Sequence, residues 1–170
     1  MCELPDQEVT IRPATQADLA AVRDVLESTW HATYDAIFGK QQVDAIVAAW
    51  HSMEALERRQ LEPGTAFLVA EMDWRVVATA FARPGADDCV QLRQMYVLPE
   101  AQGRCIGRRL LAAILAAFPR ARTMKLEVEP RNARAIAFYE RAGFRVVGEG
   151  DDCGGCGSRM PHLVMEKRLA

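Results

Sequence analysis

The sequence predicts an α+β fold. Its first third carries apolar residues at helical spacing, whereas β-rich runs begin at Thr65. From residue 89 to residue 141, strand-like and helix-like stretches alternate in a β-α-β-α section. The chain has 170 residues, 50% of them hydrophobic, and has no internal repeat or linker. We therefore expect one domain, residues 1–170, which is long enough to bury a core without disulfides.

The first third is expected to hold one strand and two helices. Residues 8–12 resemble a short strand, and Thr15 with Asp18 forms a capping pair for the first helix. A second helix is expected from about Gln41 to Leu61, where Pro63-Gly64 follows. The segment Trp30 to Tyr34 is expected to lie between them. The apolar face of the first helix is Leu19, Val22, Val25 and Leu26.

The rest of the chain begins with a predicted hairpin. Residues 67–70 and 76–80 are β-rich runs separated by Asp73-Trp74. A third strand is expected over residues 89–97, followed by a helix that begins near Gly107. A strand over 124–129, a helix over 132–141 closed by Gly143, and a strand pair, 145–148 and 162–167, complete the order.

Charge and hydropathy exclude two classes of partner. The net charge is −2, from 21 Lys+Arg and 23 Asp+Glu, which argues against nonspecific nucleic-acid binding. The longest apolar run, Leu110 to Phe118, is far shorter than the ~20 residues of a membrane span, so no membrane association is expected. Glu3, Asp6 and Glu8 stand where a signal peptide would be basic. We expect a cytoplasmic protein.

Five cysteines, an odd number, favour reduced thiols over a disulfide framework. Cys153 and Cys156 have the spacing of metal ligands, but His162 is the one nearby candidate for a further ligand. A four-coordinate site needs more, so no metal is expected and a Gly-rich loop with two thiols is the preferred interpretation.

The first segment with functional chemistry is the turn Gln102 to Arg109, which joins a strand to a helix. The first backbone N–H groups of a helix are unpaired and electropositive, so this turn can bind a phosphate. Arg104, Arg108 and Arg109 oppose the helix dipole, a cost that a bound anion would offset. A solvated loop with ordinary arginines is the alternative.

The second segment runs from Leu126 to Phe144. Glu127 and Glu129 share one face of a strand because side chains alternate along it. Asn132 and Tyr139 are seven residues apart and so share one face of a helix. The alternatives are that Asn132 caps the helix, Tyr139 packs and the glutamates are solvated.

Together these segments resemble the GNAT superfamily of N-acetyltransferases. The phosphate-loop pattern of that family, Gln/Arg-x-x-Gly-x-Gly/Ala, is met except that Cys105 stands at a glycine position. Glycine there lets the backbone approach the phosphate closely. The second signature of the family is met at every position, by Asn132, Ala135, Phe138, Tyr139, Gly143 and Phe144.

The resemblance implies a GNAT-like mixed, mostly antiparallel sheet flanked by helices and splayed between strands 4 and 5, with acetyl-CoA as co-substrate. It assigns proton donation to the leaving thiolate to Tyr139 and the role of base to Glu127, with Glu129 left open as the rival. The residues that it assigns to cofactor binding are Met95, Tyr96, Val97, Gln102, Gly103, Arg104, Cys105, Ile106, Gly107, Arg108, Asn132 and Tyr139.

The resemblance is least informative about the acceptor. It assigns acceptor binding to the first helices, through Trp30, His31 and Tyr34, although packing is an equal alternative for Trp30. The expected acceptor is a primary amine, either a small molecule such as a polyamine or a protein N-terminus. A non-catalytic acyl-CoA-binding sensor is the alternative function. A homodimer is left open.

Overall fold

The computed structural model describes residues 8–151 and 160–169. They form two compact units, which we describe separately. Unit 1 comprises the chain up to Phe81 together with Gln94–Ala117, and unit 2 comprises Ala82–Arg93 and the chain from Phe118 onward. The seven strands hydrogen-bond in the order β1-β2-β3-β4-β5-β7-β6.

Unit 1 holds most of the helices. Its β-structure consists of β1 (Val9–Pro13), β2 (Ala66–Met72), the first part of β3 (Arg75–Pro84) and the last part of β4 (Cys89–Val97). Its helices are α1 (Leu19–Phe38), α2 (Lys40–Trp50), α3 (Met53–Leu61) and α4 (Ile106–Ala117), with short 3₁₀ turns η1 (Gln16–Asp18) and η2 (Pro99–Ala101). The two strands predicted over residues 67–70 and 76–80 are confirmed as β2 and β3, and Asp73-Trp74 is the turn between them.

Two expectations for the first third are wrong. The segment Trp30 to Tyr34 does not lie between helices, because α1 continues through it to Phe38. The second helical stretch is broken in two after Trp50, where Ser52 caps α3 by accepting a hydrogen bond from Ala55 N (3.2 Å). A serine side chain satisfies a free N–H of a new helix start, which periodicity alone does not detect.

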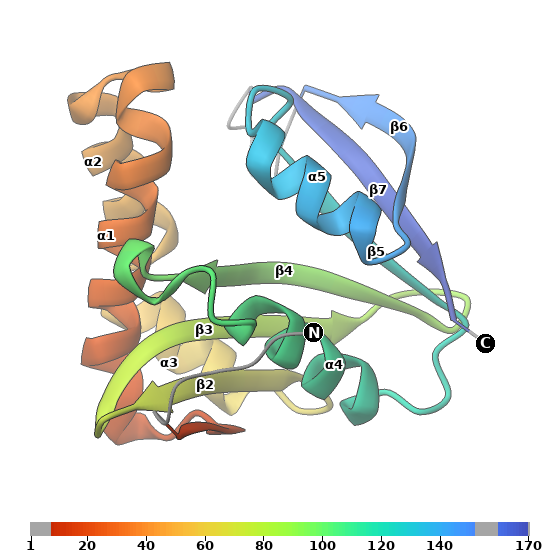
Figure 1. Ribbon diagram of the computed structural model, residues 1–170, viewed down its shortest axis with the longest axis horizontal. Helices are drawn as coiled ribbons and strands as arrows, with labels where there is room; N and C mark the ends of the chain where they lie inside the picture. Colours follow the sequence, from red (N-terminus) through yellow and green to blue (C-terminus); the bar gives the residue numbers. More distant parts are fainter. Residues whose placement is uncertain (1–7, 152–159, 170) are drawn as a thin grey trace. The chain divides into compact units, whose positions relative to one another are not determined.

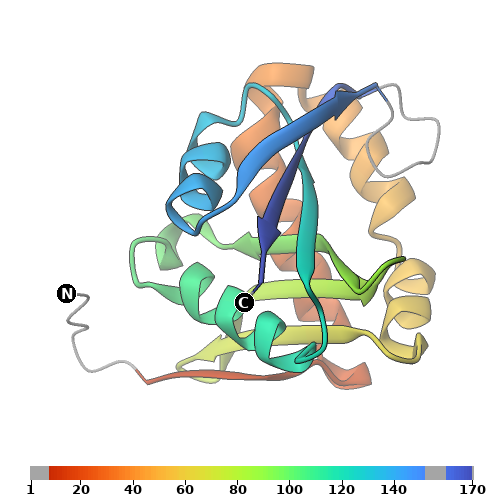
Figure 2. The ribbon, with the colours of Figure 1, turned by 90° about the vertical axis from the view of Figure 1, so that its right-hand side faces the viewer.

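The helices of unit 1 lie on both faces of its strands (Figure 1). Helix α4 covers one face, and α1 with α3 covers the other, as the turned view in Figure 2 also shows. The predicted apolar face of α1 is buried, and α4 buries Ile106, Leu110, Leu111 and Ile114. This packing fixes the start of α4 against β1 and β2, and it therefore also fixes the turn that begins at Gln102.

An ion-pair network holds β1 to the start of α1. Arg12 donates to both oxygens of Asp18, at 2.7 and 2.9 Å, and to Glu71 of β2 at 2.8 Å. Thr15 donates to Asp18 from its N–H and its hydroxyl, which confirms the predicted capping pair. These hydrogen bonds hold the pKa of Asp18 well below its usual range, and the bond from Arg12 has the largest effect.

Unit 2 contains β5 (Thr123–Val128), α5 (Ala133–Arg141), β6 (Arg145–Gly150) and β7 (His162–Arg168). Strand β5 pairs antiparallel with β7, and β7 pairs antiparallel with β6, which confirms the predicted last strand pair. The pairing of β4 with β5 is parallel and runs from Cys89 opposite Thr123 to Leu92 opposite Leu126. That register ends there although both strands continue, so the predicted mixed sheet, splayed between strands 4 and 5, is confirmed.

Within residues 8–151 and 160–169, no helix is long and apolar enough to cross a membrane. The same residues contain no group of three or more His, Cys, Asp and Glu side chains arranged for a metal ion. Cys153 and Cys156 lie outside the described residues, and His162 is buried with its Nδ1 3.4 Å from Met160 O.

Candidate functional site

The turn before α4 has the backbone geometry of an anion site. Gly103 (φ +80°) and Cys105 (φ +60°) both adopt the left-handed conformation. Such residues turn successive N–H groups toward a common concavity, and the free N–H groups of the first turn of α4 follow directly. Ile106 is buried and Gly107 has no side chain, so these residues can offer a ligand only their backbone. These donors fit a pyrophosphate group.

The side chains of this turn fall into two kinds. Gln102 and Arg109 hold the turn against neighbouring strands. Gln102 Nε2 donates to Val97 O (2.9 Å), and Arg109 Nη2 donates to Val9 O (2.7 Å). Arg104 and Arg108 make weaker contacts to sulfur, with Met72 Sδ (3.8 Å) and Cys105 Sγ (3.4 Å). Both side chains carry a guanidinium group, which can pair with the oxygens of an anion.

The cysteines differ from expectation at one position. Cys89 is a free thiol, but Cys105 is disulfide-bonded, so the expectation of reduced thiols is wrong for Cys105. A non-glycine residue in the left-handed conformation is strained by roughly 1–2 kcal/mol. The structure therefore gives a physical reason for the glycine of the family pattern at this position. Cys2 lies outside the described residues.

Two carboxylates near the end of β5 have different surroundings, because β5 ends at Val128, one residue short of the predicted strand, and Glu129 lies just after it. The Glu127 side chain is 29% exposed, and its Oε1 lies 3.8 Å from Arg93 Nη1. The Glu129 side chain is only 4% exposed, and it accepts hydrogen bonds from the backbone N–H of Arg131 and from Arg131 Nε (2.8 Å). Glu129 thus closes its own turn, whereas Glu127 remains accessible to a substrate.

Helix α5 begins and ends as its motif predicts. Asn132 caps it, since Oδ1 accepts from Ala135 N (3.1 Å), and Gly143 (φ +91°) ends it in the left-handed conformation. Tyr139 is buried between the rings of Phe138 and Phe144, at centroid distances of 5.2 and 5.5 Å. Asn132 therefore caps the helix and Tyr139 packs against its neighbours, as the alternatives stated. Each contact also fixes the orientation of its side chain.

The residues expected to bind the acceptor lie on α1 in unit 1. Trp30 and Tyr34 are buried, with their rings tilted against each other at a centroid distance of 4.6 Å, so the packing alternative holds for Trp30. Tyr96 of β4 lies 6.3 Å from the Trp30 ring. His31 bridges two carboxylates, with Nδ1 2.8 Å from Asp35 and Nε2 3.1 Å from Asp44. His31 therefore joins α1 to α2.

A polar cluster that the sequence did not indicate adjoins Trp30. His51 is 2% exposed, its ring lies 5.8 Å from that of Trp30, and its Nδ1 lies 3.1 Å from Gln94 Nε2. Burial, together with the charge of Arg59, lowers the pKa of His51 to about 3, so the imidazole is neutral. Trp30 Nε1, His51 Nε2 and Gln94 Oε1 have no hydrogen-bond partner among the described residues. Buried polar atoms of this kind mark a place for a bound water or a polar ligand group.

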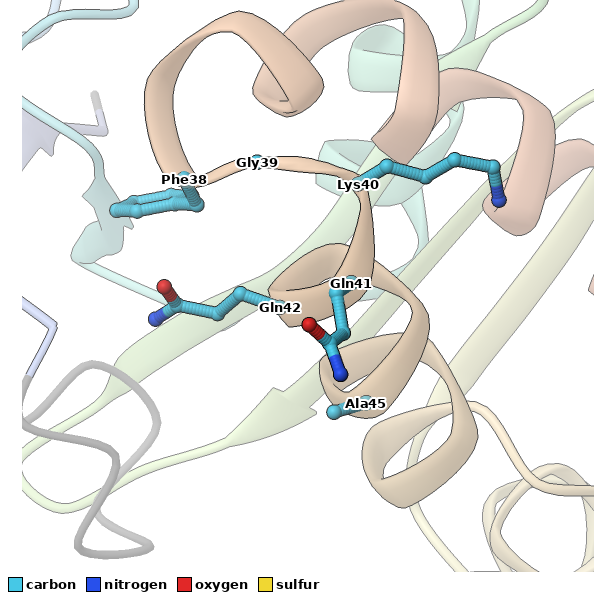
Figure 3. Close-up of a pocket in the computed structure, with 6 residues that line it drawn as sticks. All are labelled: Phe38, Gly39, Lys40, Gln41, Gln42 and Ala45. Carbon is cyan, nitrogen blue, oxygen red and sulfur yellow. The ribbon is translucent and has the colours of Figure 1, made fainter.

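A surface hollow of about 590 Å³ lies where α1 meets α2 (Figure 3). Figure 3 shows Phe38 and Gln42 extending to the same side of this junction. The Phe38 ring lies 5.8 Å from Tyr34, so the hollow adjoins the aromatic side chains of α1. It is lined by Phe38, Gly39, Lys40, Gln41, Gln42 and Ala45.

The fold combines a mixed sheet with a left-handed turn at the start of a helix, the arrangement that the sequence resemblance implied. Residues 22–144 match the acetyltransferase (GNAT) family. The chain belongs to this family. The matched region includes the turn before α4, both carboxylates near the end of β5 and the whole of α5.

Two sequence relatives are uncharacterised N-acetyltransferases. One, from Mycobacterium tuberculosis, is 33% identical over 89 residues, covering 51% of this chain. The match spans 57% of that relative's own length. The other, YjgM of Escherichia coli, is 27% identical over 177 residues and covers 99% of this chain and 98% of its own.

Two solved structures are similar over almost the whole chain. The PaiA N-acetyltransferase of Thermoplasma acidophilum, solved in complex with coenzyme A, has a TM-score of 0.82 at 24% identity and covers 95% of this chain and 99% of its own. The ribosomal-protein-alanine N-acetyltransferase of Brucella melitensis has a TM-score of 0.70 at 30% identity. The match covers 94% of this chain and 99% of the Brucella chain. The first likeness supports the fold alone.

Sequence reasoning missed two partners of the expected site residues. Arg93 is adjacent to Glu127 because the parallel register sets Leu92 opposite Leu126, and a register cannot be derived from one strand's pattern. His51 is missed because it stands in a helix break that the periodicity did not indicate. A third feature, Trp74 in a tight turn, was visible in the sequence but was interpreted only as a hairpin signal.

Proposed function

We propose that this protein is an acetyl-CoA-dependent N-acetyltransferase that moves the acetyl group to a primary amine, and that residues 1–170 act as one N-acetyltransferase domain. The observation that carries the proposal is the turn Gln102–Gly107, in which two left-handed residues precede the free N–H groups of α4. Membership of the GNAT family supports it, and the Thermoplasma protein, which shares the fold, was solved in complex with coenzyme A. The family match includes residues of both units, which supports a single functional domain.

In this proposal the backbone of Gly103 to Gly107 binds the pyrophosphate, with Arg104 and Arg108 supplying charge. Gln102 acts indirectly, because it holds the end of β4 through Val97 O. Met95, Tyr96 and Val97 are half-buried, as suits backbone groups that receive the pantetheine arm, and Asn132 contacts the same arm.

The proposed chemistry is direct transfer. The amine must lose a proton before it attacks the thioester carbon, and Glu127 takes this proton, directly or through water. The new C–N bond forms as the C–S bond breaks, and the leaving thiolate receives a proton from Tyr139. The exposure of Glu127 and the engagement of Glu129 with Arg131 favour Glu127 as the base. A catalytic acid must be held in place, and the two phenylalanine rings around Tyr139 do so.

The acceptor site is proposed on α1, at Trp30, His31 and Tyr34. The unpaired polar atoms beside Trp30 support it, because a bound acceptor could supply their missing partners. The acceptor is a small amine such as a polyamine or a protein N-terminus, and the expected compartment is the cytoplasm. The alternative, a non-catalytic acyl-CoA sensor, has less use for an accessible glutamate such as Glu127.

Two measurements test the proposal in sequence. Saturating CoA at 100 times its dissociation constant should add about 2.7 kcal/mol to stability, which is a rise of about 5–10 °C in Tm for a chain of this size. Release of CoA from acetyl-CoA should then depend on an added amine from a panel that includes polyamines and N-terminal peptides. An unmoved melting curve with a folded protein overturns the cofactor assignment. Binding without turnover on any amine favours the sensor.

A further inference from the structure

Trp74 occupies a position that folding alone does not explain. It is 96% exposed, the one aromatic among the exposed large apolar residues in the described ranges. Asp73 (φ +50°) and Trp74 (φ +62°) are both left-handed, as in a type I′ hairpin turn, where glycine or asparagine is preferred at the second position. The indole therefore adds backbone strain and gains no burial in return. Strain of this kind is expected where a side chain contacts a ligand.

The hairpin tip is tied to the segment that leads into the phosphate-binding turn. Met72, two residues before Trp74, contacts Arg104 Nη1 through its sulfur (3.8 Å). Arg75, the next residue, lies 3.4 Å from Glu100 of η2. The backbone of Leu98 donates to Val77 O of β3 (2.9 Å). All of these residues belong to unit 1, and Figure 1 shows the β2–β3 tip at the same end of this unit as the turn that follows β4.

This placement restricts what can reach the indole. A nucleotide bound by its pyrophosphate in the turn Gln102–Gly107 carries its base one ribose away from the phosphate. An exposed indole at the neighbouring hairpin tip offers a flat π-face, and bases stack on aromatic side chains without needing any specific hydrogen bond. The Arg104 guanidinium contacts Met72, two residues before Trp74, so the turn and the base of the hairpin tip lie next to each other.

We propose that Trp74 is a cofactor-binding residue that stacks on the adenine ring of the acyl-CoA. The inference rests on the proposed function, because it needs the pyrophosphate in the turn before α4. It adds a base-recognition element on the β2–β3 hairpin, outside the loop and helix that carry the family motifs.

The test compares ligands with and without the adenine. Calorimetric titration should give Trp74→Gly a CoA affinity about fivefold to a hundredfold weaker than that of wild type, the range that base–aromatic stacking supplies. Dephospho-CoA, which keeps the adenine, should lose as much, whereas 4′-phosphopantetheine, which lacks it, should bind both proteins equally. Trp74→Phe keeps an aromatic face and should retain most of the affinity.

The stability of the ligand-free variant distinguishes a folding defect from lost stacking, because a folding defect would lower its Tm. Trp74→Gly removes left-handed strain, so its Tm without ligand should rise by about 2–4 °C even as CoA affinity falls. Leu61→Ala is the matched control, because Leu61 is also an exposed apolar residue of unit 1, at 75% exposure. Its affinity for CoA should equal that of wild type.

Fluorescence supplies a direct readout. Stacking should quench the exposed indole, so CoA should lower the emission of wild type more than that of Trp74→Phe, and 4′-phosphopantetheine should not. If wild type binds CoA and Trp74→Gly binds it equally well, the stacking inference is wrong and the proposed function stands. If wild type does not bind CoA at all, the proposed function fails, and the inference fails with it.

Discussion

Two polar side chains of unit 1, Asp18 and His51, and one of unit 2, Glu127, lie in opposite environments. Asp18 and His51 are buried, and each is held by a side-chain partner, Arg12 and Gln94 respectively. Glu127 is also beside a partner, Arg93, but keeps 29% of its side chain exposed. A polar group enclosed by the fold contributes to stability, whereas one that stays open to solvent can exchange a proton with a substrate.

A similar contrast separates two carboxylates that are two residues apart. Glu127 lies in β5, which ends at Val128, whereas Glu129 follows the strand and is enclosed by its own turn, so the expected shared strand face is not observed. Mutations should therefore divide into those that change the rate and those that change the free energy of unfolding.

The largest effect is expected at Glu127. Glu127→Gln keeps the shape but removes the proton acceptor, so kcat at neutral pH should fall by about 10²–10⁴-fold, the usual contribution of a general base. The KM for acetyl-CoA should barely move, because the phosphate-binding turn is untouched. Steady-state kinetics with any working amine measures both values. A large rise in KM with kcat unchanged would assign Glu127 to binding instead.

Tyr139→Phe should lower kcat by tenfold or more, because the ring still packs between Phe138 and Phe144 but the donor is gone. The affinity for CoA should stay nearly the same. Calorimetry and kinetics on the same preparation test this pair of expectations. An unchanged kcat at every pH would leave Tyr139 with a packing role alone.

The buried side chain of His51 should make the stability of the protein depend on pH. Its pKa is about 3 in the folded protein and near 6.5 when unfolded, so the unfolded state binds the extra proton first. Stability should thus fall as the pH drops below about 6.5, by about 2 kcal/mol at pH 5 from this residue alone. Urea unfolding at pH 7 and pH 5 should show a smaller difference for His51→Phe than for wild type. Equal differences would contradict the assignment of a buried neutral imidazole.

The smallest effect is expected at Cys105. In reducing buffer, Cys105→Gly should be about 1 kcal/mol more stable than Cys105→Ala, because glycine adopts φ +60° without strain. Both variants lack the thiol, so the comparison isolates the backbone. CoA affinity of the glycine variant should equal or exceed that of wild type, and a tenfold loss would reveal a contact made by the sulfur.

The sequence predicted the strands, α4 and α5 because each has a clear hydrophobic period and a turn or cap at its ends. It failed at Trp30 to Tyr34 and after Trp50, where polar residues interrupt the apolar pattern of α1 and a serine cap starts a new helix. Backbone motifs such as Gln102–Gly107 were predictable, since glycines and a helix start define them. The difference between Glu127 and Glu129 was not, because it depends on Arg93 from another strand and on the turn at Arg131.

We propose that the accessible carboxylate, Glu127, acts in the reaction, whereas the enclosed one, Glu129, stabilises the fold. The most direct test measures pH–rate profiles and melting temperatures of wild type, Glu127→Gln and Glu129→Gln together. We expect Glu127→Gln to lose rate at neutral pH, to recover partly at higher pH where free amine is more abundant, and to keep its Tm. Glu129→Gln should lower Tm and follow the wild-type profile. A Glu127→Gln profile that matches wild type, with the loss of rate in Glu129→Gln, would contradict the account.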